Sequence, residues 1–339
     1  MKKMIAFILA LTVMAGLLFG CGEEKKEEDN RNPNGMKIAT TTGDFKAYAD
    51  SQEDRIDLLH EAGFRYIDLS LYDKADMEPF FEDNWKTVAA DLKKYASDKG
   101  MEFVQAHAIG GNAFKDEESY DTIVKNTIRG IEVCKELGIP QIVVHAPYRS
   151  HMTKDEFFEE NKAFYQEFVP TMEATGVKVL IENSAQKIVG CDYYFYTGAD
   201  MREFIEYFDH PLLAACWDTG HANVQGRQYE DIIDLGDLLA GIHVADNNGE
   251  EDEHLMPYQG TMSIDAVMTA LVKIGYKGAF TFECENNLNA GLTWPNPREK
   301  FDQSLKAYMP PVEIKMEVEK TMYNIAVHIL TKYKIEIAG

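Results

Sequence analysis

Metal-capable side chains are most concentrated in the stretch HVADNNGEEDEHLMPYQG, residues 243–260. Its first twelve positions contain two histidines and five acidic residues, and the whole stretch lacks Lys and Arg. Imidazole nitrogens and carboxylate oxygens bind divalent cations, and they also accept and donate protons in catalysis. Because the stretch follows a short apolar run, we expect His243 to end a strand and the acidic residues to form the loop after it.

Similar side chains end several other short apolar runs. Six of eight such runs end in or near one, and five of the nine histidines of the chain belong to the set. The set consists of His107, His145, Glu182, Asp218, His221, His243, Asp252, His254 and Glu283. In a parallel sheet all strands point the same way, so we expect these side chains to gather at one rim.

The elements that would position them form a regular alternation of strands and helices. Eight strand-like runs begin at Met36, separated by segments with helical periodicity, of which the clearest are 52–62, 85–99, 119–137 and 154–175. Eight parallel β/α units close a (β/α)8 TIM barrel, whose usual length of about 250 residues agrees with residues 36–309. A doubly wound open sheet is the alternative, but TTTGD at 40–44 lacks the glycine spacing of its phosphate loop. We therefore predict an α/β protein with a single barrel domain at 36–309 and a C-terminal extension of undetermined structure at 310–339.

Four of the rim residues form the strongest candidate metal site. Glu182, Asp218 and Glu283 would converge with His243 in the barrel mouth, where buried carboxylates repel one another unless a cation lies between them. Three oxygens and one imidazole suit Mn²⁺, Mg²⁺, Co²⁺ or Zn²⁺. His107 and His145, each taken alone, fit a hydrogen-bonded rim residue better than a ligand. Asp252 and His254 fit a ligand, a substrate contact or a surface residue equally well.

The N-terminus predicts export. A short basic start and an apolar run end in LFGC, so residues 1–20 are typical of a lipoprotein signal peptide, with Cys21 as the lipidated residue. Residues 21–35 are charged and polar and predict a disordered tether. Removal of residues 1–20 takes away two lysines and changes the formal charge from −23 to −25. We expect a bacterial protein that is anchored to a membrane outside the cytoplasm and, at this charge, does not bind nucleic acid.

At these residues the chain resembles the xylose isomerase-like TIM-barrel superfamily, to which sugar phosphate isomerases and epimerases and the class-two apurinic endonucleases belong. The resemblance lies in FVQAHA, VVHAPY, VLIEN, WDTGH, residues 241–265 and GYKGAFTFECE, and it covers most of the barrel. Epimerase-like members imply one divalent metal on Glu182, Asp218, His243 and Glu283. In those members the two glutamates act as acid and base, and the residue at the position of His221 contacts the sugar. In the endonuclease branch, the resemblance instead implies a multi-zinc site on all nine positions. Tyr258 departs from the family, which usually has Gly there.

Charge and aromatic residues favour a neutral carbohydrate over a phosphodiester. A phosphate needs cations beside the metal, but the loop after His243 and residues 285–297 contain no Lys or Arg. The nearest expected cations are Arg149, Lys187 and Arg227. Aromatic side chains stack on sugar faces, and we take Trp217, Trp294 and the aromatic residues at 193–196 as candidates, with Arg149 as a further weak substrate contact.

The sequence thus predicts a divalent-metal-dependent isomerase or epimerase of an unphosphorylated sugar or keto-sugar. Glu182 and Glu283 would be the acid/base pair, acting through an enediolate. The alternatives are a phosphodiesterase with two or three zinc ions, a 3-keto-glycoside lyase or dehydratase, and a sugar-binding lipoprotein without activity. The expected partners are a small carbohydrate and, through the lipid on Cys21, a membrane, while the oligomeric state is not indicated.

Overall fold

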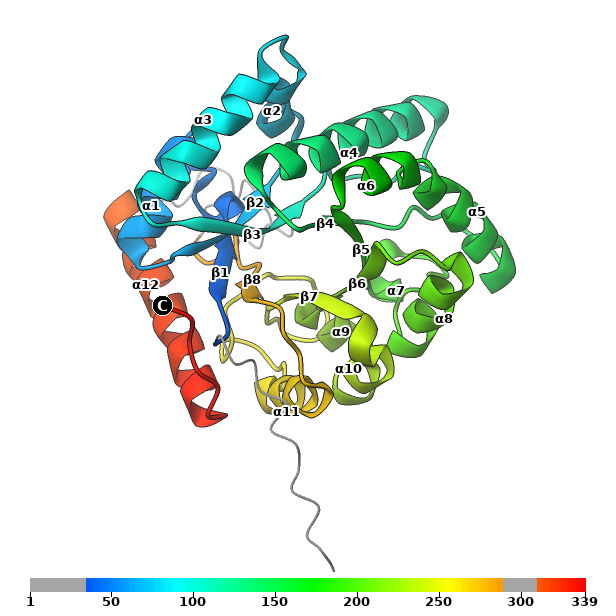
Figure 1. Ribbon diagram of the computed structural model, residues 1–339. Coiled ribbons are helices and arrows are strands. Elements are labelled where there is room, and N and C mark those ends of the chain that lie inside the picture. Colours follow the sequence, from blue (N-terminus) through cyan, green and yellow to red (C-terminus); the bar gives the residue numbers. More distant parts are fainter. Residues whose placement is uncertain (1–34, 289–309) are drawn as a thin grey trace, which may run out of the picture. The chain divides into compact units, whose positions relative to one another are not determined.

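The computed structural model describes residues 35–288 and 310–339, and these contain a barrel of eight parallel strands (Figure 1). The strands are β1 (Ile38–Thr41), β2 (Tyr66–Ser70), β3 (Glu102–His107), β4 (Gln141–Val144), β5 (Lys178–Glu182), β6 (Leu213–Asp218), β7 (Leu239–His243) and β8 (Phe280–Phe282). They pair in the order β7-β6-β5-β4-β3-β2-β1-β8, and a parallel bridge between Val244 and Phe282 joins the two ends of this order. Each of the eight expected strands is present, and the predicted (β/α)8 barrel is confirmed.

The α-helices of the described residues mostly lie outside the strands (Figure 1). They are α1 (Gln52–Ala62), α2 (Lys74–Met77), α3 (Trp85–Asp98), α4 (Glu117–Leu137), α5 (Lys154–Gln166), α6 (Val169–Thr175), α7 (Gln186–Val189), α8 (Gly198–Phe208), α9 (Thr219–Gln225), α10 (Tyr229–Leu235), α11 (Ile264–Ile274) and α12 (Val312–Lys332). The expected helix at 154–175 is two helices, because Pro170 occupies the first turn of α6 and cannot continue the hydrogen bonding of α5.

Local sequence signals fix where the helices begin and end. The Ser51 side chain accepts a hydrogen bond from the Asp54 amide and starts α1, and Thr153 with Glu156 forms a capping box at the start of α5. Helix α1 ends at Gly63, whose φ of 109° is a left-handed conformation that favours glycine. Helix α1 therefore ends a few residues before β2 begins at Tyr66.

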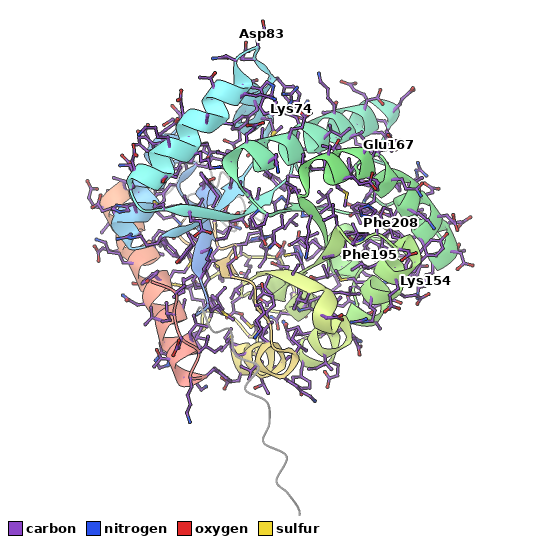
Figure 2. The ribbon with its side chains drawn as sticks, in the orientation of Figure 1. Lys74, Asp83, Lys154, Glu167, Phe195 and Phe208 are labelled. Carbon is purple, nitrogen blue, oxygen red and sulfur yellow. The ribbon has the colours of Figure 1, made fainter. Side chains whose placement is uncertain are left out.

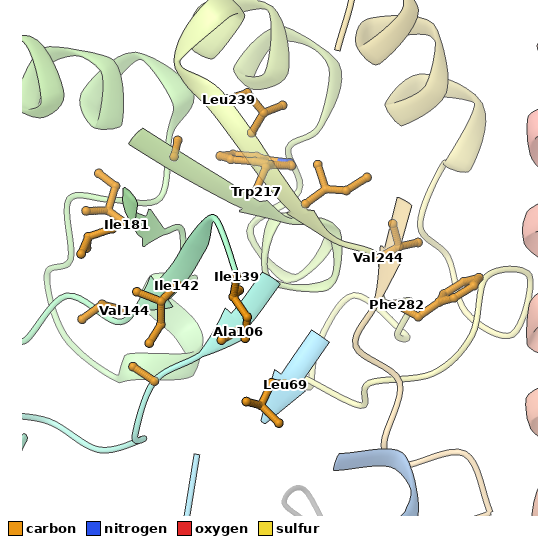
Figure 3. Packing of buried hydrophobic residues seen from close by; sticks show 14 of the residues in the cluster. Leu69, Ala106, Ile139, Ile142, Val144, Ile181, Trp217, Leu239, Val244 and Phe282 are labelled. Atoms are coloured by element: carbon orange, nitrogen blue, oxygen red, sulfur yellow. The ribbon is translucent and has the colours of Figure 1, made fainter. Parts of the chain in front are cut away.

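Strand alternation separates two sets of side chains. The outward-facing set, which includes Ile142, Ile181 and Trp217, packs against the helices (Figure 3). The inward-facing set includes Val143, Leu180, Ala214 and Cys216, which form a separate cluster. Gly241 faces inward too, and a Cβ there would lie 2.5 Å from the Gln105 Oε1 and 2.8 Å from the Leu180 Cδ1. A small or apolar residue, two positions earlier in the same strand, therefore shares the inward face with each of Glu182, Asp218 and His243.

Aromatic residues form much of the outer layer of the core. Phe195 follows β5 and packs against Phe157 and Phe204, with ring centroids 4.9 and 4.8 Å apart. Phe195 and Phe208 are buried, whereas charged residues such as Lys74, Asp83 and Glu167 lie exposed at the outer edge of the helical ring (Figure 2). The aromatic side chains after β5 thus pack in the core more than they form the expected sugar contact. Tyr193 is also buried in this core, at 2% exposed, but it lines the cavity as well.

The C-terminal residues, whose structure the sequence did not indicate, form α12. This helix packs on α1 and β1 (Figure 1), and Lys332 contacts Asp265 of α11 at 2.6 Å. Met36 at the start of the barrel forms a parallel bridge with Ile337. Residues 312–332 therefore occupy the place of an outer barrel helix between α11 and α1, with Met322 and Ile329 buried and His328 exposed.

Three predictions fall wholly or partly outside the described residues. These are the signal peptide at 1–20 with Cys21, the tether at 21–35, and the expected sugar contact Trp294. Of the tether only Gly35 is described, and it is buried against the backbone of Ile337 and Ala338. Among the described residues, no helix combines the length and the hydropathy that crossing a membrane requires.

Candidate metal centre and active site

The expected rim residues meet in one cavity of about 500 Å³. The residues of the expected set that line it are His107, His145, Glu182, His221, Asp252, His254 and Glu283. Asp218 and His243 are fully buried beneath them. All nine predicted positions are thus brought together at the C-terminal ends of the strands, where TIM barrels hold their active sites, and the volume is typical of a small-molecule pocket.

The centre of the site is formed by Glu182, Asp218, His243 and Glu283. One ligand atom from each lies within 4.8 Å of the others. The His243 Nδ1 is 2.5 Å from the Glu182 Oε1 and 3.1 Å from the Glu283 Oε2. Since β5, β6, β7 and β8 each end here, the closure of the barrel itself creates this group.

Three further histidines are oriented by backbone carbonyls. The Nδ1 atoms of His107, His221 and His254 lie 2.8, 2.8 and 3.1 Å from the carbonyl oxygens of Ala108, Asn183 and Glu283, respectively. An Nδ1–H that donates to a carbonyl leaves the Nε2 lone pair available. In each ring that Nε2 faces a carboxylate of the site, which is the orientation that a metal ligand requires.

These histidines define two more groups with metal-ligand spacing. His107 and His145 meet at Glu182, where the His145 Nε2 is 2.7 Å from the Glu182 Oε2. His221 and His254 meet at Asp252, and their Nε2 atoms lie 3.2 and 3.0 Å from the Asp252 Oδ2. Asp252 is 4% exposed, so its side chain belongs to the site and not to the solvated surface.

Electrostatics in the site reflect an excess of carboxylates. Burial raises the pKa of Asp218 to about 7; His221 opposes this rise, and the charges of Glu182 and Glu283 reinforce it. Burial also disfavours ionised Glu283, but His243 outweighs burial and lowers the pKa of that carboxyl to about 2. Burial opposes a charge on His243 as well, yet the surrounding acidic groups raise its pKa well above the usual value. Without another cation, protons therefore compensate the negative charge.

The residues fit a divalent cation. The Asp218 Oδ2, the Asp252 Oδ1 and the His107 Nε2 are buried and have no hydrogen-bond partner. A buried polar atom without a partner is costly, and both kinds of atom, carboxylate oxygen and imidazole nitrogen, can bind a cation. The mixture of carboxylate oxygens and imidazole nitrogens suits Mn²⁺, Co²⁺ or Zn²⁺, and Mg²⁺ where oxygens dominate.

Three further residues, Trp217, Arg149 and Trp294, were expected to contact the substrate. Trp217 was wrongly expected to contact substrate: it is fully buried in the outer core, because its neighbour Asp218 faces inward and adjacent residues of a strand face opposite ways. Arg149 does not line the cavity; it pairs with Glu160 and stacks on Phe114. Trp294 lies outside the described residues.

Several residues of the site were missed in the sequence. Tyr72 follows β2, lines the cavity, and places its ring centroid 5.3 Å from that of His107 and 6.1 Å from that of His145. Lys46 lines the rim and pairs with Asp73. Asp68 lies beneath His243. Asp68 interrupts the apolar run YIDLSLY, and a charged residue within such a run is the signal that would have identified it.

Comparison of the chain with protein families assigns it to one of them. A sequence model described as "Xylose isomerase-like TIM barrel" matches residues 56–309, and the chain belongs to this family. An uncharacterized protein of Methanocaldococcus jannaschii is 30% identical over 199 residues, which are 56% of this chain and 64% of that protein. An inosose isomerase of Bacillus velezensis is 21% identical over 239 residues, which are 67% of this chain and 81% of that protein.

Solved structures share the fold at low identity. The IolI protein with a bound zinc atom has a TM-score of 0.67 at 19% identity, covering 88% of this chain and 99% of that one. D-psicose 3-epimerase with D-tagatose from Clostridium cellulolyticum H10 has a TM-score of 0.67 at 16% identity, covering 87% of this chain and 99% of that one. The E. coli 3-keto-D-glucoside 4-epimerase has a TM-score of 0.62 at 18% identity, covering 85% and 99%.

Proposed function

We propose that this protein is a divalent-metal-dependent isomerase or epimerase of an unphosphorylated sugar or keto-sugar. The observation that carries the proposal is the position of Glu182 and Glu283. They line one cavity, come from strands three apart around the barrel, and approach the same nitrogen of His243. Family membership supports the proposal, as do the names of the epimerases and the inosose isomerase that the chain resembles.

The reaction requires proton transfer at a carbon next to a carbonyl. Glu182, Asp218, His243 and Glu283 would hold the cation, which supplies Lewis-acid polarisation of the carbonyl and its neighbouring hydroxyl. Both glutamates have pKa values below the usual range although burial alone would raise them, because His243 and, for Glu182, His107 and His145 stabilise the carboxylates. Either one is therefore available as the base that removes the proton. Return of the proton to the same carbon from the opposite face gives epimerisation, whereas its return to the former carbonyl carbon gives isomerisation. Elimination from a 3-keto-glycoside begins with the same proton removal.

The charge of the cavity supports a neutral substrate. Among the lining residues that the structure describes, Asp73, Glu182, Asp252, Glu283 and Glu285 are acidic, and Lys46 is the one Lys or Arg. Lys46 already pairs with Asp73. Arg149 and Lys187, which the sequence offered as cations for a phosphate or carboxylate, pair instead with Glu160 and Glu250.

Metal content and proton exchange test the proposal together. We expect the full-length chain, purified in detergent without chelators, to contain about one divalent metal per molecule, as a site of four ligands implies. We also expect it to incorporate solvent deuterium into a keto-sugar such as D-psicose or a 3-keto-glucoside. A metal-loaded protein that binds such sugars without any exchange would instead be a sugar-binding protein, and the proposal would be wrong.

A multi-zinc phosphodiesterase is the second candidate. The two additional groups with metal-ligand spacing favour it, because the Nε2 atoms of His107, His221 and His254 all face carboxylates. This candidate requires two or three zinc ions per chain and loss of zinc when His107, His145 or His254 is replaced by Ala. Hydrolysis of bis-p-nitrophenyl phosphate that depends on these histidines would establish it over the isomerase.

Tyr72 gives a prediction about substrate binding. Its side chain is 44% exposed within the cavity and lies over His107 and His145, so it can stack on a sugar face. Tyr72→Ala should raise KM by about 2- to 10-fold with a smaller effect on kcat, since aromatic contacts contribute about 0.5–1.5 kcal/mol. The matched control is Tyr207→Ala, which removes a similarly exposed tyrosine on the outer helix α8. Equal KM values in the two variants would remove Tyr72 from the substrate site.

We also propose that the barrel acts outside the cytoplasm, attached by a lipid on Cys21. The support is the order of charge, apolar run and LFGC at the N-terminus. Cys21→Ser should release the protein from the membrane fraction, and labelling with a radioactive fatty acid measures the lipid directly.

A further inference from the structure

The two ring nitrogens of His243 face different surroundings. Nδ1 faces Glu182 and Glu283 in the cavity, whereas Nε2 points into the barrel interior. There it lies 3.3 Å from the Asp68 Oδ2 and 2.9 Å from the Gln105 Nε2. Asp68 and Gln105 are 2% and 1% exposed, so they are part of the barrel interior and not of the substrate cavity.

The orientation of the Gln105 amide follows from its other contacts. Its Nε2 donates to the Asp68 Oδ2 at 2.8 Å, and its Oε1 accepts from the Gln141 Nε2 at 3.1 Å. A flipped amide would place two oxygens together at Asp68 and two N–H groups together at Gln141. Gln105 therefore presents an N–H to His243, and Asp68 presents a carboxylate oxygen.

These two neighbours favour opposite tautomers of His243. The N–H of Gln105 favours an Nε2 without a proton, in which case Nδ1 carries the hydrogen that reaches Glu182. An Nδ1 that binds a cation must lack a proton, so the hydrogen of the neutral ring must then lie on Nε2. Of Asp68 and Gln105, only Asp68 offers an acceptor for the hydrogen on Nε2. The Asp68 Oδ1 is buried without a hydrogen-bond partner, so this carboxylate has unused capacity in the present arrangement.

We propose that Asp68 is a positioning residue that holds the His243 tautomer with Nδ1 free for the divalent cation, and that Gln105 opposes it. Asp68 would thus set metal affinity without touching metal or substrate. The inference rests on the proposed function, because it assigns Asp68 a role in the same metal site. It differs from a general packing role in one respect: loss of Asp68 should weaken binding of the cation, whereas loss of Gln105, the other neighbour of the same nitrogen, should not.

A cobalt titration of the full-length chain, followed by visible absorption with chelator competition, measures this difference. Asp68→Leu should weaken Co²⁺ binding by about 10- to 100-fold, as the loss of a hydrogen bond behind a metal ligand typically does. Gln105→Met should leave the affinity equal to that of the wild type or raise it. Asp231→Asn alters a buried acid that accepts from the Gly198 amide at the start of α8 and does not line the cavity; it controls for stability and should not change the affinity.

Two outcomes would overturn the proposal: an unchanged affinity in Asp68→Leu, or an equal loss in Asp68→Leu and Gln105→Met. If Asp68→Leu does not fold, Asp68→Asn replaces it, and wild-type affinity there would also overturn the proposal. In the zinc-loaded wild type, nitrogen-15 NMR should find His243 protonated at Nε2. The signals of His243 are assigned by their loss in His243→Gln. Coordination of zinc through Nε2 would also overturn the proposal. A wild type that binds no Co²⁺ would instead contradict the proposed function.

Discussion

Glu182→Gln and Glu283→Gln are each expected to reduce turnover of the keto-sugar by about 10²- to 10⁴-fold, the usual contribution of one general acid or base. Glutamine keeps the shape of the side chain but cannot accept the proton. The measurement is kcat at saturating metal, combined with solvent deuterium exchange, because both residues are also expected ligands and the variants should bind the cation more weakly. Both variants should remain folded, since the hydrogen bonds that fix the strands are unchanged.

The control for charge is Glu250→Gln. Glu250 belongs to the acidic loop after β7 but is exposed and pairs with Lys187 at 3.3 Å. The same substitution there should leave kcat unchanged. If Glu182→Gln and Glu283→Gln both keep wild-type turnover, the assignment of the acid/base pair is wrong.

Lys315→Met is expected to lower the free energy of unfolding by about 3–5 kcal/mol, the usual cost of removing one partner of a buried ion pair. Lys315 and Glu319 of α12 are fully buried with their charged atoms 2.7 Å apart, and the Lys315 Nζ also donates to the Asn287 carbonyl at 3.0 Å. Burial and Glu319 raise the pKa of the neighbouring Asp44, and Lys315 opposes that rise. Without the ammonium, Glu319 would be a buried charge beside another acid.

Equilibrium unfolding in urea measures this loss, with two comparisons. Lys320→Met removes an exposed partner of Glu317 on the same helix and should change stability by at most about 0.5 kcal/mol. The double variant Lys315→Met with Glu319→Met should recover most of the loss, because an apolar pair avoids the desolvation of two charges. A double variant as unstable as Lys315→Met would show that the packing of Lys315, and not its charge, stabilises α12.

The Lys315 contact also links α12 to the site. Asn287 donates to the Cys284 carbonyl at 3.1 Å and accepts from the Met256 amide at 3.3 Å. These contacts connect the loops after β8 and β7, which carry Glu283 and His254. The segment at 310–339, to which the sequence assigned no chemistry, thus supports the loops that hold the candidate ligands.

Much of the fold followed from local patterns in the sequence. Short apolar runs alternating with helical segments predicted eight strands, and glycines such as Gly63 marked helix ends, because those preferences act within a few residues. One local signal was present but overlooked: Pro170 divides the expected helix at 154–175. Helix α9 gave little signal, since Thr219–Gln225 contains few strong helix formers and is started by the Asp218 side chain.

The sequence by itself determined which residues could form the site. Strand ends with His, Asp or Glu meet at one rim in any closed parallel barrel, so the set from His107 to Glu283 could be recognised without coordinates. Only the tertiary structure decided what these side chains and their neighbours contact. It showed that Trp217 faces the core, that Asp252 is buried between His221 and His254, and that Asp68 lies behind His243. The reason is physical. Alternation and strand ends are local properties of the chain, whereas these contacts join residues far apart in sequence and exist only once the barrel has closed.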